Sequence, residues 1–442
     1  MIVMKFGGTS VGNAQNIENV AEIIQSYVYK KPIVIVSAVA KITDKLIRLA
    51  HAASERQEND IFQDIKKIHI TILKELDFPI TLLDEDFKNL LEIIEKVKGK
   101  TSLETLDYIQ SFGEQLSSKI VATTLLQKGV EAKAINAWDL GLVTTKDFGN
   151  AEPLKEAFEE IQKKIALLSY IPIITGFIGK TKEGKTTTLG RGGSDYSAAI
   201  IGNAIDAEEI QIWTDVDGIL STDPKLIPQA KTIPEVSFAE AAELAYFGAK
   251  VLHPKTMLPA MQKNIPVRIL NSFNPKNQGT IITKERNSQS FKVKAIAVKK
   301  DVMLIDIHST RMLGAYGFLS KIFSIFNHYK KSIDVIATSE VSVSLTIDNA
   351  QYLEEIKKEL EELGTINVWP DQAIICIVGE GMREALEVPG DTFSLLAKHK
   401  IRVDLISQGA SQVNITFLVE EKDVQKTLEL LHQLYFEEQK AL

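Results

Sequence analysis

The chain has 442 residues, with 51 Lys and Arg against 58 Asp and Glu, and this net charge of -7 argues against nucleic-acid binding through overall charge. Hydrophobic residues make up 45% and charged residues 25%, which is ordinary for a globular protein of two or three domains. Cys376 is the single cysteine, and neither a signal peptide nor an apolar run of roughly 20 residues is present. We therefore expect a soluble, cytoplasmic protein with neither a membrane nor a nucleic-acid partner.

Short apolar runs alternate with helical patterns from residue 1 to about 285. The runs are rich in β-branched residues and often continuous, which is typical of strands buried on both faces of a parallel sheet. We expect strands at 2–6, 32–36, 132–136, 171–175, 210–214 and 267–270. Helical patterns separate them at 17–30, 101–128 and 238–249. The alternation predicts an α/β sandwich, and the charged, helical stretch 51–100 predicts an all-helical insertion.

Two polar, turn-rich stretches, NPKNQGT (274–280) and KERNSQS (284–290), predict a domain boundary. Beyond it, DVIATSEVSVSLTI (334–347) aligns with DLISQGASQVNITF (404–417) at a constant offset of 70. Helical patterns precede and follow each copy. Two copies of a small β-α-β-β-α-β unit explain the repeat, with chance similarity between strand-rich sequences as the alternative.

The stretch GKTKEGKT (179–186) matches the phosphate-binding P-loop pattern G-x-x-x-x-G-K-[ST]. A true P-loop opens directly into a helix, but here three threonines and the glycines of LGRGG follow, which disfavour one. We therefore predict a hairpin with KEG (182–184) as its turn and Lys185 near a solvated tip. The P-loop remains the alternative, because the strand that ends in Asp215 would suit its magnesium ion.

Phosphate chemistry is better placed at the glycine-rich end of the first strand. In KFGGTSVGN (5–13), a tight Gly-Gly turn lies beside Lys5, and Thr9 or Ser10 is expected to cap the next helix. Such a turn makes a nest for anions. The alternative is a plain turn between a strand and a helix.

Two further strand ends show the same chemistry. In LGRGGSDYSAA (189–199), Arg191 offers a planar fork for a carboxylate or phosphate, and Ser194 or Asp195 is expected to cap the following helix. WTDVDGILSTDPK (213–225) is a Gly- and Asp-rich loop at the carboxyl end of a strand, a common position for a nucleotide. Taken singly, each also fits an ordinary capped helix or surface loop.

Together these motifs resemble the amino-acid kinase family and, within it, the aspartate kinases. The matching motifs occur in family order: KFGGTSVGN, SAVAKITDKL (37–46), SFGEQLSSKI (111–120), TTTLGRGGSDYSAA (186–199), WTDVDGILSTDPK and FAEAAELAYFGAKVLHPKTMLPA (238–260). The repeat is similar to the paired ACT domains of the monofunctional, lysine-sensitive branch. The resemblance implies an α/β fold: an amino-acid-kinase αβα sandwich around a mainly parallel sheet (1–285), followed by two ferredoxin-like ACT domains (293–442).

The resemblance implies that ATP, with Mg²⁺, phosphorylates the side-chain carboxylate of L-aspartate to give 4-phospho-L-aspartate, the first step towards lysine, threonine and methionine. This carboxylate is already ionised at pH 7. The reaction therefore needs charge neutralisation and in-line positioning rather than a strong general base.

Residue roles follow from the same resemblance. Lys5 is expected to bridge ATP phosphates, and Asp195 to hold Lys5 or to organise the phosphates with magnesium, with no direct metal ligand assigned. The expected substrate-binding residues are Thr43, Glu114, Arg191 and Ser194. The expected ATP-binding residues are Lys5, Gly7, Gly8, Thr9, Ser10, Thr214, Asp215, Leu220, Lys225 and Lys250. Phe112 stands where the family commonly has His, and Leu220 and Lys225 replace a common Tyr and Arg.

ACT domains imply an amino-acid effector and pairing between chains, so we expect a homodimer or a dimer of dimers. The expected effector residues are Met312, Gly317, Phe318, Leu319, Asp334, Thr338, Ser339 and Glu340. Lysine is the expected inhibitor and threonine the alternative, because Gly314 and Ala315 replace polar residues of lysine-sensitive relatives. Three other readings stay open: ACT domains without an effector, a sister kinase acting on glutamate, N-acetylglutamate or UMP, and a non-enzymatic amino-acid sensor.

Overall fold

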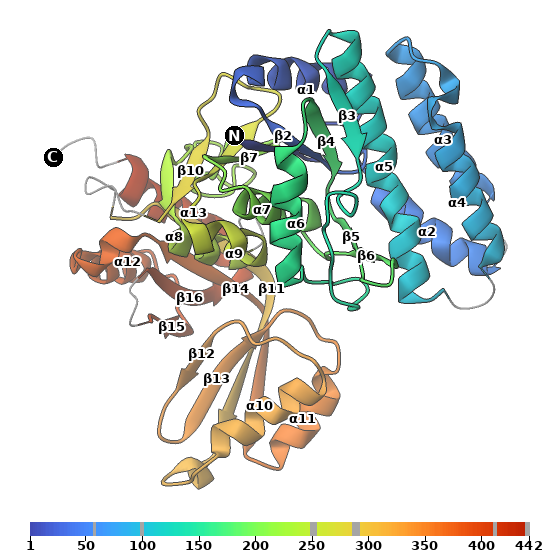
Figure 1. Cartoon of the computed structure of the whole chain (residues 1–442). Helices are drawn as coiled ribbons and strands as arrows, with labels where there is room; N and C mark the ends of the chain where they lie inside the picture. Colours follow the sequence, from blue (N-terminus) through green and yellow to red (C-terminus); the bar gives the residue numbers. More distant parts are fainter. Residues whose placement is uncertain (56–58, 98–100, 248–253, 285–291, 410–412, 438–442) are drawn as a thin grey trace. The chain divides into compact units, whose positions relative to one another are not determined.

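The computed structural model describes residues 1–55, 59–97, 101–247, 254–284, 292–409 and 413–437 (Figure 1). These residues divide into two compact units, each with its own sheet. The first unit comprises Met1–Ile219, Pro234–Phe238 and Val251–Glu285. The second comprises Leu220–Ile233, Ala239–Lys250 and Arg286–Leu442. Two short segments on the N-terminal side of the predicted boundary, 220–233 and 239–250, thus belong to the second unit.

The first unit is built on an eight-stranded sheet with the order β3-β4-β2-β1-β7-β9-β10-β8. Its strands are β1 (Val3–Phe6), β2 (Ile33–Val36), β3 (Ala132–Ile135), β4 (Ile171–Thr175), β7 (Ile210–Thr214), β8 (Glu235–Ser237), β9 (Val267–Asn271) and β10 (Thr280–Thr283). All neighbours are parallel except β9 and β10. The six predicted strands and the mainly parallel sheet are confirmed. The short strands β8 and β10 were missed, because β10 begins within the turn-rich stretch 274–280.

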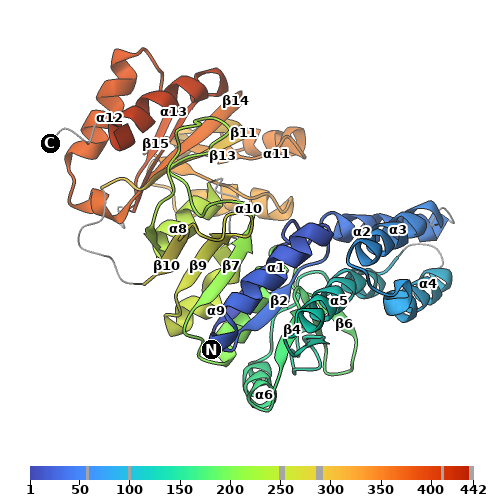
Figure 2. The ribbon, with the colours of Figure 1, turned by 90° about the horizontal axis from the view of Figure 1, so that it is seen from above.

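Helices cover both faces of this sheet. One face packs against α1 (Ala14–Ser26) and α5 (Leu103–Gln127), and α5 in turn contacts α2 (Ile42–Glu55) and α4 (Asp84–Lys96) (Figure 2). The predicted helical insertion, 51–100, contains the end of α2, α3 (Asn59–Glu75) and α4, and its apolar residues join the same core. The opposite layer contains α6 (Lys155–Ala166), α7 (Gly193–Ala204) and α9 (Pro254–Lys263).

The alternation of side chains along β1 positions a lysine. Met4 and Phe6 are fully buried in the core beneath α1 and α5. Because successive side chains of a strand point to opposite faces, Lys5 projects toward the layer that contains α7. The sequence of β1 thus places one ammonium group beside the N-terminus of α7.

The stretch that matches the P-loop pattern is a hairpin, as predicted. β5 (Ile178–Lys180) pairs antiparallel with β6 (Thr186–Thr188), and the Thr181 N–H donates to the Lys185 carbonyl across the turn at 2.8 Å. Gly184 supplies the positive φ of 82° that the turn requires. The P-loop alternative is wrong for this stretch, because a strand follows where a helix would have to begin.

Two helix caps differ from the prediction. Asn13 caps α1 by accepting a 2.9 Å hydrogen bond from the Asn16 N–H, in place of Thr9 or Ser10. α7 begins earlier than expected, directly after Gly192, whose φ is 69°, and no side chain of the described residues caps it. The amides of its first turn are therefore not occupied by a capping side chain.

The second unit contains a six-stranded antiparallel sheet with the order β12-β13-β11-β14-β16-β15. Its strands are β11 (Ala295–His308), β12 (Ile336–Thr338), β13 (Ser342–Ile347), β14 (Thr365–Val378), β15 (Leu405–Ser407) and β16 (Asn414–Glu420). Its helices are α8 (Phe238–Tyr246), α10 (Phe318–His328), α11 (Leu353–Glu361), α12 (Glu387–Lys398) and α13 (Val424–His432). One hydrophobic core lies under α10 and α11, and a second lies under α12 and α13.

Both copies of the predicted β-α-β-β-α-β repeat are present, but they share two long strands. In the first copy, the end of β11 pairs with the start of β14, from Leu304 opposite Trp369 to His308 opposite Thr365. In the second copy, the start of β11 pairs with the end of β14. Residues 295–299 thus provide the fourth strand of the second copy. The position after α13, where the repeat predicts this strand, is occupied by a π-helical turn at 433–437.

Within the described ranges, no helix combines the length and the apolar character needed to cross a membrane.

Candidate active site

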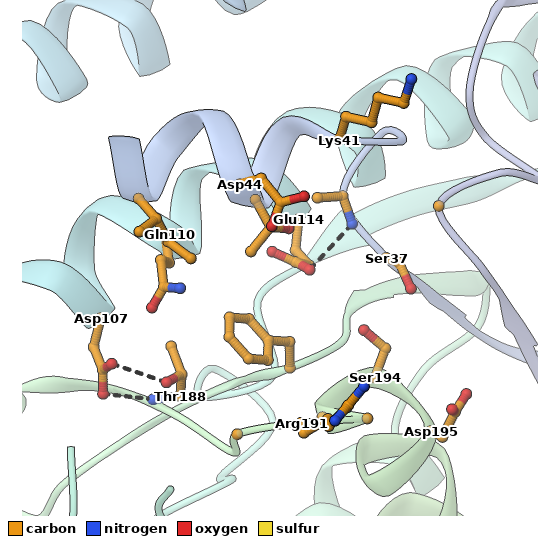
Figure 3. A pocket seen from close by; sticks show the side chains of 18 of the residues that line it. Ser37, Lys41, Asp44, Asp107, Gln110, Glu114, Thr188, Arg191, Ser194 and Asp195 are labelled. Atoms are coloured by element: carbon orange, nitrogen blue, oxygen red, sulfur yellow. Dashed lines mark hydrogen bonds between the residues drawn. The ribbon is translucent and has the colours of Figure 1, made fainter. Parts of the chain in front are cut away.

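A pocket of about 740 Å³ opens in the first unit, at the carboxyl ends of β1, β2 and β4 (Figure 3). Ligands of open α/β sheets commonly bind at this edge. Loops after these strands form part of the wall, and α2, α5, Gly149, the end of β6 and the segment from Gly190 to the start of α7 form the rest. Seven of the predicted residues line the pocket: Lys5, Gly8, Thr43, Glu114, Arg191, Ser194 and Asp195.

Lys5 and Asp195 form an ion pair inside this pocket. Lys5 Nζ lies 2.6 Å from Asp195 Oδ1, and the two side chains are only 10% and 15% exposed. Lys5 comes from β1 and Asp195 from the first turn of α7, so the pair joins the sheet to the helix. Free amides at the N-terminus of a helix attract anions, and the ammonium group adds positive charge at the same place.

Glu114 is the most unusual carboxylate in the pocket. Its side chain projects from α5 and is 3% exposed, and its Oε1 accepts a hydrogen bond from the Ala38 N–H at 3.1 Å. Oε2 is buried and has no hydrogen-bond partner among the described residues. Burial raises the pKa of Glu114 to about 8, although the Ala38 N–H and the charge of Lys5 both act in the opposite direction. The group is therefore suited to a cationic ligand, which would compensate the buried charge.

Arg191 and Ser194 lie across the cavity from Glu114 (Figure 3). Arg191 is exposed and precedes α7, whereas Ser194 lies in its first turn and is buried. Thr43 enters the pocket from the first turn of α2. The cavity thus presents a buried carboxylate on one side and a guanidinium group on the other, a pattern that suits a zwitterion.

The predicted phosphate nest is partly accessible. A Cβ on Gly8 would lie 2.8 Å from the Ala38 carbonyl oxygen, so only glycine fits this close approach. The Gly7 N–H donates to the Trp213 carbonyl at 3.0 Å. The Ser10 hydroxyl is buried and lies 2.8 Å from the Ser272 hydroxyl, so it is already bonded. Unlike Gly8, neither Gly7, Thr9 nor Ser10 lines the pocket.

The predicted nucleotide residues are distributed over both units. Thr214 ends β7, which neighbours β1, and its hydroxyl donates to Asp215 Oδ1 at 3.1 Å. Both residues therefore lie at the same edge of the sheet as the pocket. Leu220 and Lys225 belong to the second unit, and Lys250 lies outside the described residues.

Several pocket residues were not predicted. They include Ser37, Asp107, Gln110, Phe177 and Thr188. Asp107 lies seven positions before Glu114 on α5, so helical spacing placed both on one face and offered a signal in the sequence. Burial raises the pKa of Asp107, against the effect of three hydrogen bonds from Gly149 and Thr188.

No group of three or more His, Cys, Asp or Glu side chains that could hold a metal ion occurs in the part of the chain that the structure describes.

The predicted effector residues lie around α10 and β12 of the first ACT repeat, with Asp334 before β12 and Thr338 at its end. Met312 ends a short 3-10 helix, Gly317 precedes α10 with a φ of 75°, and Phe318 and Leu319 open that helix. Thr338 ends β12, and Ser339 and Glu340 lie in the connection to β13. All of these belong to the second unit.

Asp334 already has partners on one of its oxygens. Its Oδ1 accepts hydrogen bonds from Lys299 Nζ at 2.7 Å and from the Tyr246 hydroxyl at 3.1 Å. Its Oδ2 is buried without a hydrogen-bond partner among the described residues. One oxygen of this carboxylate therefore remains for a further donor.

The model of the amino acid kinase family matches residues 1–271, and an ACT domain model matches residues 375–435. The chain is 42% identical to aspartokinase 1, chloroplastic, of Arabidopsis thaliana, over 98% of this chain and 80% of the relative. It is 36% identical to lysine-sensitive aspartokinase 3 of Escherichia coli strain K12, over 99% of both chains. The crystal structure of E. coli aspartokinase III in complex with aspartate and ADP (R-state) matches with a TM-score of 0.84 at 35% identity, and covers 99% of this chain and 100% of that one. The chain therefore belongs to the amino acid kinase family and, within it, to the aspartokinases.

Proposed function

We propose that the pocket of the first unit binds L-aspartate and ATP and transfers the γ-phosphoryl group to the aspartate side chain, giving 4-phospho-L-aspartate and ADP. The observation that carries this proposal is the buried oxygen of Glu114, which has no hydrogen-bond partner among the residues that the structure describes, in a cavity that also contains Arg191 and the Lys5–Asp195 pair. The E. coli relative, whose structure was solved with aspartate and ADP, supports it.

The two ends of the cavity recognise the backbone groups of the amino acid. Glu114 binds the α-ammonium, which compensates its buried charge, and Arg191 binds the α-carboxylate through its planar fork. Thr43 and Ser194 add hydrogen bonds from either side. The side-chain carboxylate is then left free as the nucleophile.

The phosphates lie beside β1 and the start of α7. Lys5 neutralises charge on the transferred group, and Asp195 fixes the position of the lysine ammonium. The phosphate donors in this proposal are the backbone amides of Gly8, Thr9 and Ser10, and Gly7 contributes to the turn itself, since the Gly7 N–H and the Ser10 hydroxyl are already bonded. The nucleotide contacts are Thr214, Asp215, Leu220, Lys225 and Lys250.

Magnesium accompanies ATP in this proposal. Mg²⁺ is commonly held by substrate phosphates together with one or two carboxylates. The carboxylate of Asp195 in the pocket provides the oxygen chemistry that such an ion requires. The ion would reduce the negative charge that the nucleophilic carboxylate must approach.

For the domain organisation, we propose that 1–285 is catalytic and that 293–442 is a tandem ACT region that senses an inhibitory amino acid. Lysine is the preferred effector and threonine the alternative, and the name of the lysine-sensitive E. coli relative supports lysine. Asp334 Oδ2, which has no hydrogen-bond partner in the described part of the chain, would accept the effector ammonium. Exposed apolar side chains near the predicted effector residues, Leu313 and Tyr316, support pairing of chains into a homodimer or dimer of dimers. A cytoplasmic location stays a prediction.

An acyl phosphate reacts with hydroxylamine, so hydroxamate formation tests the reaction directly. With ATP and Mg²⁺, we expect hydroxamate and ADP in the presence of aspartate, and neither product with glutamate or N-acetylglutamate. ADP release with UMP would reveal the nucleotide kinase alternative. Absence of aspartate-dependent ADP release would favour a non-enzymatic sensor and would contradict the proposal.

A further inference from the structure

We propose that Asp107 is a positioning residue for the amino-acid substrate: it fixes the loop that carries Arg191 at a set distance from Glu114. This inference rests on the proposed function, in which Arg191 and Glu114 bind the two ends of aspartate. Asp107 itself need not touch the substrate.

Asp107 accepts three hydrogen bonds from two separate segments. Its Oδ2 accepts from the backbone N–H of Gly149 at 2.9 Å. The two bonds to Thr188 are drawn in Figure 3: Oδ2 accepts from the backbone N–H at 2.8 Å, and Oδ1 accepts from the hydroxyl at 2.8 Å. Asp107 is 1% exposed. Thr188 is buried as well, so water competes little with its two bonds, and losing them would leave a buried backbone donor unpaired; Gly149, by contrast, is exposed.

The segments held in this way lead directly into the Arg191 loop. Thr188 is the last residue of β6, three positions before Arg191, and its carbonyl accepts from the Ala151 N–H at 2.9 Å. The Leu189 N–H donates to the Phe177 carbonyl at 2.8 Å. The backbone at Thr188 is thus bonded on both sides, which fixes the starting point of the loop.

The loop also packs closely against the segment that follows Gly149. Gly190 has a φ of 79°, and a Cβ there would lie 2.8 Å from Asn150 Oδ1. Since Asp107 binds the Gly149 amide as well as Thr188, one carboxylate holds both surfaces of this contact. A shift of either segment would move the backbone before Arg191.

Helix α5 gives this arrangement a fixed length. Asp107 and Glu114 are separated by seven residues, or about two turns and roughly 10 Å along the axis. Both line the same pocket. One helix therefore provides the carboxylate for the α-ammonium and also holds the loop for the α-carboxylate. Misplacing a binding group by about 1 Å can cost roughly 100-fold in rate, so this spacing affects catalysis.

The hydrogen-bond pattern predicts a difference between two substitutions. In Asp107→Asn, the amide oxygen can accept both backbone N–H groups, and the amide nitrogen can donate to the Thr188 hydroxyl. In Asp107→Ala, all three bonds are lost. If the role is positioning, asparagine should restore function although it removes the negative charge.

Steady-state kinetics of the full chain test the inference, with KM measured separately for aspartate and for ATP. We expect Asp107→Ala to raise the KM for aspartate about 10-fold or more and to change the KM for ATP less than about 2-fold. For Asp107→Asn, we expect a KM for aspartate within about 3-fold of that of the unmodified enzyme. Asp86→Ala is the matched control. Like Asp107, Asp86 is a buried aspartate that links α5 to another segment: from α4 it pairs with Lys119 of α5 at 2.7 Å. Unlike Asp107, it lies outside the pocket. Asp86→Ala should lower the melting temperature and leave the ratio of the two KM values unchanged.

Thr188→Val provides a second test if Asp107→Ala does not fold, because it removes one of the three bonds and keeps the backbone amide. We expect Thr188→Val to raise the KM for aspartate about 3-fold and to leave the KM for ATP unchanged. Provided that the unmodified enzyme phosphorylates aspartate, two outcomes would overturn the inference: equal changes in both KM values, or an unchanged KM for aspartate in both variants. If the unmodified enzyme shows no aspartate-dependent ADP release, the proposed function itself fails, so the two failures are distinguishable.

Discussion

The Ala38 backbone N–H donates a 3.1 Å hydrogen bond to Glu114 Oε1, while Glu114 Oε2 stays buried and unpaired among the described residues. One bond is not enough to keep a carboxylate charged at this depth, so the pKa of Glu114 rises to about 8. The free pocket therefore holds a protonated Glu114 at neutral pH, and an ammonium ligand must displace that proton.

Aspartate binding should consequently depend on pH. We expect the KM for aspartate to fall by up to about 10-fold per pH unit between pH 6 and pH 8, and to level off above pH 8, where Glu114 is already ionised. The KM for ATP should change far less, which serves as the internal control. Initial rates at several pH values measure both constants, and a flat KM for aspartate across this range would contradict the prediction.

The same shift makes Glu114 a source of instability at high pH. Its folded pKa lies above its unfolded value of about 4.5, so its contribution to stability is present below that value and is lost as the pH rises toward 8. Glu114→Gln should therefore raise the melting temperature relative to the unmodified protein at pH 8 and change it little at pH 5. Thermal unfolding without aspartate measures this, and an equal effect at both pH values would show that charge is not the cause.

Two lysines should behave oppositely on substitution. Lys5→Ala removes a buried cation from Asp195 and should lower kcat by about 100-fold or more, as expected when one group that stabilises developing charge is lost. Lys185 is half exposed and pairs with exposed Glu104 at 2.7 Å, so Lys185→Ala should stay within about 2-fold, since exposed pairs contribute about 0–1 kcal/mol. Rates of ADP release compare them. A large loss at Lys185 would reopen the question of phosphate binding at the hairpin.

His69 should make the helical insertion sensitive to acid. It is fully buried on α3, its Nε2 has no hydrogen-bond partner in the described residues, and burial lowers its pKa to about 4. Because the folded pKa lies below the unfolded value of about 6.5, stability is complete above pH 6.5 and falls toward pH 4, by on the order of 3 kcal/mol. His69→Leu should flatten this dependence in urea unfolding at pH 7.5 and 4.5. His51→Leu, at an exposed position of α2, should leave it unchanged.

Feedback inhibition should depend on Asp334. With lysine as effector, Asp334→Ala should raise the concentration for half inhibition by about 10-fold or more, because the buried oxygen that accepts the ammonium is lost. Titrations with lysine, threonine and methionine compare the candidate effectors. If only threonine inhibits, threonine replaces lysine as the proposed effector. If none of the three inhibits, the result supports ACT domains without an effector.

Much of the kinase sheet was predictable because a parallel strand buried on both faces leaves a continuous apolar signature. The runs at β2 and β4 show it, β1 and β7 show it apart from Lys5 and Gln211, and the face on which Lys5 lies follows from the simple alternation of side chains along β1. β8 escaped because it has only three residues, and β10 because it begins within the turn-rich stretch 274–280. The two strands pair with each other across a long stretch of sequence, which no local pattern records.

The site was predictable where charge and glycine coincide, and less so where partners come from distant segments. Lys5, Arg191 and Asp195 lie in glycine-rich strand ends that indicate anion binding. Asp107 carries no such sign, since its partners Gly149 and Thr188 are 42 and 81 residues away. The helix starts were misjudged because several residues in each loop can cap a helix, and only the folded backbone selects between them.

The two shared strands of the regulatory region have a consequence for protein engineering. Residues 295–299 and 374–378 form one ladder, although the whole first repeat lies between them in the sequence. Cutting the chain between the repeats would leave each fragment with an unpaired strand edge, a site for aggregation. Neither repeat can therefore be transplanted by itself, and a chimaera that exchanges effector specificity between relatives must move the two repeats as a single block.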